Sequence, residues 1–219
     1  MAKMEWDKTG ERLWETGVEQ AALFLLDEAG AYGNGEAWNG LIGVTESPSG
    51  AEPTALWAND KKYGELLSTE EFGGSIEAYT YPDGFKACNG EAEIAPGVTI
   101  SQQTRKTFGM AYKTLVGNDV VGTKYGYKLH LVYGAKAAVS EKANQTISDS
   151  PEAMTMSWEF STTPVAVEGF EPTSQLVINS NTVAPEKLAA LEAKIYGSED
   201  TEPSLPLPNE VLELIGEAA

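Results

Sequence analysis

The chain has 219 residues, of which 42% are hydrophobic, and this is enough apolar material for the core of one main domain. Lysine and arginine number 15 against 33 aspartates and glutamates, so the formal net charge is −18. Because Lys and Arg supply most of the non-specific affinity for phosphates, this charge argues against a protein that binds nucleic acid tightly.

The first seventeen residues, MAKMEWDKTGERLWETG, are predicted to form a polar arm that carries Trp6 and Trp14. Their charges are scattered and they lack the apolar stretch of a secretory signal. Nowhere does an uncharged apolar run reach the roughly 20 residues of a membrane helix, so we expect no membrane contact. Two exposed tryptophans would be unusual in a monomer, and we therefore expect the arm to be buried against another surface.

The first core element is expected in VEQAALFLLD, residues 18–27, as a strand, although an apolar run of this length also fits a short helix. The following AYGNGEAWNG, residues 31–40, is rich in glycine. It lacks the spacing of a dinucleotide-binding fingerprint, which opens a helix after a strand. We interpret it as a loop between strands, and the next residues, LIGVTESPSG, as extended chain.

Residues 45–66 are predicted to form a long surface loop that contains Trp57 and Tyr63. Two interpretations stay open. The aromatic side chains could fold back onto the core, or the loop could bind another molecule, because long loops in compact domains are often functional and aromatics are enriched at interface hot spots.

Residues 81–106 are a second irregular segment, and they contain Cys88. A single cysteine excludes an intrachain disulfide and the zinc motifs that need two or more cysteines. Cys88 and His130, each the only residue of its type, could in principle form a nucleophile pair. Nothing around Cys88 in the sequence indicates an activated thiol.

Residues 107–133 are predicted to form two antiparallel strands, with the Gly/Asn/Asp-rich VGNDVVGTKYG between them. Period-two spacing in the second strand assigns alternate residues to two faces. Tyr127, Leu129, Leu131 and Tyr133 lie on one face, and Lys128, His130 and Val132 on the other, less apolar face. We expect His130 to be structural and hydrogen-bonded across the strands.

A further strand is predicted in MTMSWEFS, where Met154, Met156, Trp158 and Phe160 alternate with polar residues. No Gly-x-Ser-x-Gly elbow, His-Glu-x-x-His motif or second histidine is present, and paired carboxylates are expected by chance in so acidic a chain. The sequence therefore predicts no enzyme, no metal and no cofactor.

The C-terminal part begins with a helix in APEKLAALEAKIYG, where Leu188, Leu191 and Ile195 share one side, with Pro185 in the first turn and Gly197 as the stop. An acidic, proline-rich linker and a short apolar patch follow, which either pack on their own domain or reach a neighbour. The predicted organisation is an arm at 1–17, a β domain at 18–197 containing the 45–66 loop, and an extension at 198–219.

Several segments together resemble the tail tube, or major tail, proteins of long, non-contractile-tailed phages. They are EAYTYPDGFKACNG, GVTISQQTRKTFGMAYKTLVGND, YGYKLHLVYG and SPEAMTMSWEFSTTPV, and the similarity covers roughly residues 15 to 197. The resemblance implies a mainly β fold, a β-sandwich or β-barrel with a flanking helix. It also implies hexameric rings that stack into the hollow tube of the virion tail, assembled in the host bacterial cytoplasm.

The family offers no catalytic residues, but it implies that a long loop and the terminal arms bridge successive rings. The candidate interface residues are then Trp57 and Tyr63 in the loop and Trp6 and Trp14 in the arm. Glu159, on the polar face of its strand, is the candidate for the channel lumen, provided that the helix does not cover this face. The implied partners are further copies of the chain and the tape measure, tail terminator and distal tail proteins. DNA would pass through without tight binding.

Two other interpretations remain open. Contractile-tail and secretion-system tubes share this general architecture. The resemblance therefore indicates a tube more strongly than it indicates which of these assemblies the tube belongs to. A monomeric β-sandwich that binds a carbohydrate or a protein through its aromatic side chains also fits the composition.

Overall fold

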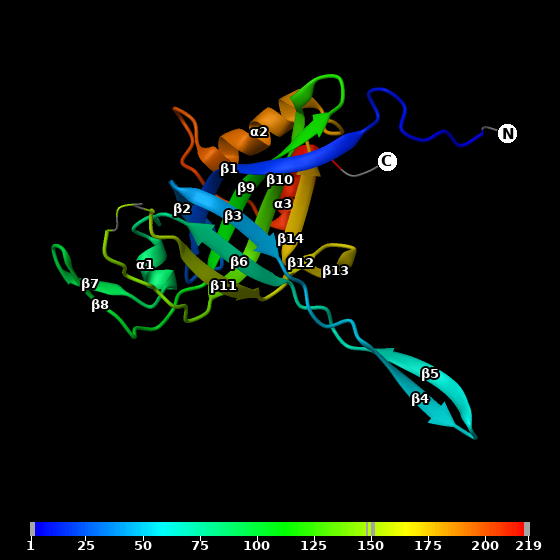
Figure 1. Cartoon of the computed structure of the whole chain (residues 1–219), viewed down its shortest axis with the longest axis horizontal. Helices are drawn as coiled ribbons and strands as arrows, with labels where there is room; N and C mark the ends of the chain where they lie inside the picture. Colours follow the sequence, from blue (N-terminus) through cyan, green and yellow to red (C-terminus); the bar gives the residue numbers. More distant parts are fainter. Residues whose placement is uncertain (1–2, 148, 150–151, 217–219) are drawn as a thin grey trace.

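The computed structural model describes residues 3–147, 149 and 152–216, and within them the chain is built mainly from antiparallel strands, with three helices. The ends of the predicted arm and extension, residues 1–2 and 217–219, lie outside this range. Figure 1 shows a body from which one long hairpin projects.

The first layer of the body is a sheet centred on three long strands (Figure 1). They are β1 (Leu13–Leu26), β9 (Phe108–Asn118) and β10 (Gly122–Ala137), with β2 (Tyr32–Ala37) beside β1 and β14 (Gln175–Asn179) beside β10. All these pairs are antiparallel. Asn118 stabilises the turn between β9 and β10, because its Oδ1 accepts hydrogen bonds from the N–H groups of Val120 and Val121.

The second layer crosses in front of the first and consists of β3 (Leu41–Glu46), β6 (Gly73–Ala78) and β11 (Met156–Thr162) (Figure 1). The last residues of β10, Ala135 to Ala137, pair with β11 and so join the two layers into one folded sheet. The chain is therefore mainly β, with two layers packed face to face.

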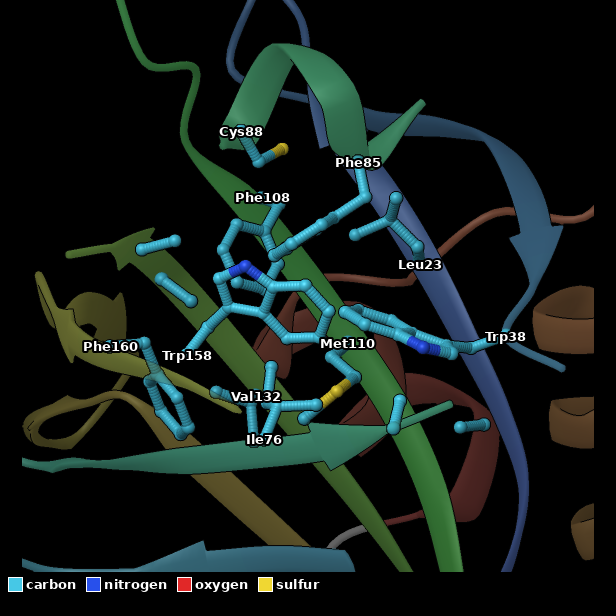
Figure 2. Close-up of a cluster of buried hydrophobic side chains, with 14 of the residues drawn as sticks. Leu23, Trp38, Ile76, Phe85, Cys88, Phe108, Met110, Val132, Trp158 and Phe160 are labelled. Carbon is cyan, nitrogen blue, oxygen red and sulfur yellow. The ribbon is translucent and has the colours of Figure 1, made fainter. Parts of the chain in front are cut away.

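An inner core, defined as the buried cluster between the two layers, is dominated by aromatic side chains (Figure 2). Its labelled members are Leu23, Trp38, Ile76, Phe85, Cys88, Phe108, Met110, Val132, Trp158 and Phe160. The short helix α1 (Phe85–Cys88) covers one end of this cluster, and the ring of Phe85 packs edge-on against Trp158 with centroids 5.1 Å apart. Tilted and edge-to-face rings are the favoured arrangement of packed aromatics.

An outer core lies on the opposite face of the first layer, under α2 (Pro185–Tyr196) and α3 (Pro208–Ile215). It includes Phe24, Tyr32, Leu129, Leu131, Tyr133, Leu188, Leu191 and Ile195. The first layer is therefore buried on both faces, which explains why its strands are nearly continuous apolar runs.

Three two-stranded hairpins extend from the body. They are β4 (Pro53–Ala58) with β5 (Lys61–Leu67), β7 (Ala92–Ala95) with β8 (Val98–Ile100), and β12 (Val165–Val167) with β13 (Phe170–Thr173). The first stands far from the rest of the molecule (Figure 1) and is called the distal hairpin below.

Several sequence predictions are confirmed. Strands lie in the predicted segments, at residues 13–26, 108–118, 122–137 and 156–162, and the predicted helix is α2, with Leu188, Leu191 and Ile195 buried. The loop predicted at 116–126 is shorter than expected, because both strands extend into it and leave only residues 119–121 as the turn. Pro185 lies at its first turn and Gly197 at its end. The short-helix alternative for residues 18–27 is wrong, because these residues belong to β1.

Other predictions need correction. Residues 32–37 are strand β2 rather than a loop, because their backbone pairs with β1. The arm ends before Leu13, since β1 begins there and Trp14 pairs with Gly117 of β9. The extension is not separate from the β domain: Leu205 forms a bridge with Tyr32, and α3 packs on the outer core. Met154 lies before β11 and is partly exposed.

Candidate assembly surface

The distal hairpin forms through a two-residue turn at Asn59 and Asp60. Both residues have positive φ, 49° and 59°, as a type I′ turn requires, and Asn and Asp tolerate this conformation better than most residues. Ala58 and Lys61 form the last pair before the turn, so the register of the hairpin follows from its own sequence.

A ribbon of two extended chains, residues 47–52 and 68–72, connects the distal hairpin to β3 and β6 (Figure 1). Within this stem, Ser49 and Glu71 exchange two backbone hydrogen bonds of 2.8 Å. A Ser68 hydroxyl oxygen also accepts a hydrogen bond of 3.0 Å from the Glu52 N–H. The hairpin is thus held at a distance from the body by ordered backbone pairing.

The distal hairpin exposes large apolar side chains on both strands. Trp57 is 70% exposed and Tyr63 is 79% exposed, and Leu56, Leu66 and Leu67 are exposed as well. An isolated two-stranded hairpin is only marginally stable in water, and a contiguous apolar patch usually marks an interaction site. The interpretation that Trp57 and Tyr63 fold back onto the core is wrong. The sequence analysis did not include these three leucines among the candidate interface residues. Their position as large apolar residues in a predicted surface loop could have identified them.

The N-terminal arm places its two tryptophans differently. Trp6 lies before β1 and is 77% exposed. Trp14 lies within β1, and its indole covers Gly117, where an added Cβ would come within 2.6 Å of the ring. The end of the arm is tied to the turn after β9, because the Gly10 N–H donates to Asp119 Oδ1 at 2.9 Å. Burial of Trp6 against another surface stays a prediction.

Glu159 lies on the face of the second layer that points away from the inner core. It is exposed between the buried Trp158 and Phe160, and it pairs with Ser75 of β6. Glu77 of β6 lies exposed on the same face, opposite Ser157. The larger helices, α2 and α3, pack on the outer core instead, so the condition attached to the Glu159 prediction is met. Glu77 was missed, although the alternation of Ser75, Ile76 and Glu77 could have revealed it.

His130 is part of a buried polar cluster between the layers. Its Nε2 lies 2.9 Å from Thr114 Oγ1 on β9, and its ring stacks on Tyr112 with centroids 4.6 Å apart. Its Nδ1 lies 3.4 Å from Glu46 Oε1, which accepts hydrogen bonds from the Tyr112 hydroxyl at 2.7 Å and the Gln175 amide at 2.6 Å. The expected cross-strand hydrogen bond is therefore present.

The environment of His130 suits a structural side chain. Burial lowers the pKa of His130, although the nearby Glu46 carboxylate opposes this effect. The face that carries Lys128, His130 and Val132 is not the solvent side of the sheet: His130 and Val132 are both buried there. Cys88 is buried in the inner core, and burial raises its pKa to about 12, so its thiol stays protonated at neutral pH.

No three His, Cys, Asp or Glu side chains in the part of the chain that the structure describes lie close enough to hold a metal ion. None of the helices within the described ranges is long and apolar enough to cross a membrane.

Comparisons with known proteins assign no family to the chain. No protein-family model matches the sequence, and no curated protein matches it either. The features that bear on function are therefore the projecting apolar hairpin, the exposed Trp6 and the uncovered acidic face.

Proposed function

We propose that the protein is a structural subunit that polymerises as stacked hexameric rings into the tail tube of a long, non-contractile-tailed phage. The observation that carries the proposal is the distal hairpin, which holds Trp57, Tyr63 and Leu67 exposed on an ordered stem. In a monomer these apolar side chains stay exposed to water and contribute no burial energy, whereas a neighbouring subunit would bury them. The sequence resemblance supports the same assignment.

The edges of the sheets support self-assembly as well. Among the described strands, β14 pairs only with β10 and β3 pairs only with β6, so each has one unpaired edge. Unpaired edges are hazards in a monomer, but in a ring they pair with the next subunit. Neighbouring copies would then continue the sheet around the tube.

The charge supports a channel for DNA. Six copies at −18 each carry a formal charge of about −108 per ring before screening by salt. An acidic wall offers few cations that could displace the phosphate counterions, so DNA would slide through without sticking. The uncovered face with Glu77 and Glu159 is our candidate for the lumen.

The proposal places the protein in the virion tail after assembly in the cytoplasm of a host bacterium. Its partners would be other copies of the chain and the tape measure, tail terminator and distal tail proteins. We propose no catalytic role, since His130 and Cys88 are buried in structural environments and no cofactor is needed.

Electron microscopy of the purified protein in negative stain, across a concentration series, tests this function. Hollow tubes or stacked rings that become more abundant with concentration are the expected result. Particles that remain monomeric at every concentration would overturn the proposal. They would favour the monomeric binding module, in which Trp57 and Tyr63 contact a carbohydrate or protein ligand.

A further inference from the structure

Three asparagines in the chain, Asn34, Asn39 and Asn89, are followed directly by glycine. In such a pair the backbone nitrogen of the glycine can attack the side-chain carbonyl carbon, Cγ, of the asparagine. Glycine favours this attack because it has no Cβ to obstruct the approach and because its backbone rotates freely. The three pairs are therefore alike in local sequence, and the tertiary structure decides which of them can react.

The pair at Asn34 is protected by hydrogen bonding and packing. Asn34 lies within β2, and the Gly35 N–H donates a hydrogen bond of 3.1 Å to the Pro203 carbonyl oxygen. A Cβ on Gly35 would come within 2.5 Å of the Phe24 ring, so this backbone lies directly against the outer core. The Gly35 nitrogen cannot attack Asn34 without breaking the hydrogen bond and displacing the packed strand.

The pair at Asn89 is protected in a different way. The Asn89 side-chain amide donates a hydrogen bond of 2.7 Å to Glu91 Oε1, and the Asn89 N–H donates one of 2.8 Å to the Phe85 carbonyl oxygen. Gly90 is buried, and its carbonyl oxygen accepts a hydrogen bond of 2.9 Å from the Gln103 N–H. Both members of this pair are therefore fixed, and burial keeps water away from the Gly90 backbone.

The pair at Asn39 lacks this protection. Asn39 and Gly40 form the turn that leads into β3, and both residues are exposed. Among the residues that the structure describes, no hydrogen bond engages the Asn39 side chain or the Gly40 N–H. Gly40 has a φ of 74°, a conformation that glycine adopts without strain. The attacking nitrogen and the carbon that it attacks are therefore accessible to water and unrestrained by hydrogen bonds.

We propose that Asn39 is a site of spontaneous deamidation, which converts it to aspartate and isoaspartate. The Gly40 nitrogen loses its proton to water and bonds to Asn39 Cγ. The bond from Cγ to the side-chain nitrogen breaks, and that nitrogen takes up a proton and leaves as ammonia. Water then opens the resulting succinimide ring. Attack at Cγ gives aspartate, and attack at the main-chain carbonyl carbon gives isoaspartate, in which the backbone runs through Cγ. The reaction needs only water, so the inference does not depend on the proposed function.

The two products differ in their effect on the fold. Aspartate adds a negative charge in an exposed turn, whereas isoaspartate also lengthens the backbone by a CH₂ group between two anchored residues. Trp38 Nε1 donates to the Thr80 carbonyl oxygen at 2.9 Å, and the Gly40 carbonyl oxygen accepts from the Tyr79 N–H at 2.8 Å. A Cβ on Gly40 would lie 3.0 Å from the Thr80 methyl carbon, so a longer chain has little room. Isoaspartate should therefore loosen the start of β3.

Mass spectrometry of peptides from the full-length chain tests the proposal. The wild-type protein is kept at mildly alkaline pH, once folded and once unfolded in urea, and deamidation is followed over time at the three asparagines. In urea all three should react at similar rates. In the folded chain Asn34 and Asn89 should react at least about tenfold more slowly than in urea, because local opening must come first, whereas Asn39 should stay within about threefold of its rate in urea.

Two substitutions identify the reacting residue. Asn39→Gln keeps the amide on a longer side chain, which disfavours ring closure, so the isoaspartate formed in the folded chain should fall by at least about tenfold. Asn144→Gln, at an exposed asparagine that is not followed by glycine, is the matched control and should leave the isoaspartate content unchanged. Equal rates at the three asparagines in the folded chain, or an unchanged isoaspartate content in Asn39→Gln, would overturn the assignment.

Discussion

The pair β9–β10 and the distal hairpin are both antiparallel and both closed by tight turns, yet their surroundings are opposite. Strands β9 and β10 are buried on both faces, between the inner and outer cores. The distal hairpin carries side chains of similar size, and it has no core at all. Local sequence therefore specifies the hairpin geometry in both places, whereas burial determines whether an aromatic side chain stabilises the fold or remains available for a partner.

Substitution by alanine at Trp158 and at Trp57 gives the largest expected difference in folding stability between the core and the distal hairpin. Trp158 is buried and packs edge-on against Trp38, Tyr81 and Phe85. Trp158→Ala should lower the free energy of unfolding by about 3–5 kcal/mol, as expected when a large core side chain is removed. Chemical denaturation measures this change. Trp57→Ala, at an exposed site, should change the free energy of unfolding of the isolated chain by no more than about 0.5 kcal/mol. A loss as large as that of Trp158→Ala would contradict the contrast between the two sites.

The distal hairpin is expected to affect assembly rather than folding. Removing a central aromatic anchor from an interface often costs 2 kcal/mol or more. Trp57→Ala should therefore raise the critical concentration about thirtyfold, at a tenfold change per 1.4 kcal/mol. Sedimentation of tubes across a concentration series measures it. Phe170→Ala, an exposed aromatic on another hairpin, is the control. Tubes that form equally well from the Trp57 variant would remove Trp57 from the interface.

His130 gives a smaller effect that depends on pH. Burial lowers the pKa of His130 in the folded chain, and the positive charge of Lys128 lowers it further, whereas the negative charges of Glu46 and Glu15 raise it. The unfolded chain regains the ordinary value of 6.5 and so binds more protons. Stability from this group is therefore complete above that pH and is lost as the pH falls below it.

The measurement for His130 is the melting temperature at neutral and at mildly acidic pH. The wild-type chain should lose more stability on acidification than His130→Gln, which cannot gain the proton. Because the variant also changes the contact with Thr114, only the difference in pH dependence is decisive. An identical pH dependence in both proteins would show that another group dominates in this range.

The uncovered acidic face should give the smallest effect on folding. Glu77→Lys with Glu159→Lys changes two exposed side chains and should alter the free energy of unfolding by no more than about 0.5 kcal/mol each. If this face lines the channel, assembled tubes of the double variant should retain DNA that wild-type tubes release. A gel-shift assay with short duplex DNA measures retention. Charge reversal at Glu186 of α2 and Glu213 of α3, which are both exposed and lie outside the distal hairpin and the acidic face, is the control.

The sequence predicted the strands and the helix that bury only one face, because in these elements apolar residues recur at the period of the strand or helix. Met156, Trp158 and Phe160 alternate with exposed residues because β11 has one buried face, and α2 shows its buried stripe for the same reason. Strand β2 was missed because Gly33 and Gly35 suggested a loop. Gly35 is required by packing instead, since a Cβ there would come within 2.5 Å of the Phe24 ring. That neighbour belongs to another strand and is invisible to a local pattern.

By itself the sequence determined the β class, the long central strands, the helix α2, the strong negative charge and the presence of aromatic residues in polar segments. These properties depend on composition and on spacing within one segment, which are local. The tertiary structure alone decided that Trp14 covers Gly117 of the neighbouring strand β9, and that Trp57 and Tyr63 stand free on a distal hairpin. These features depend on contacts between residues far apart in the chain, and no local periodicity records such contacts.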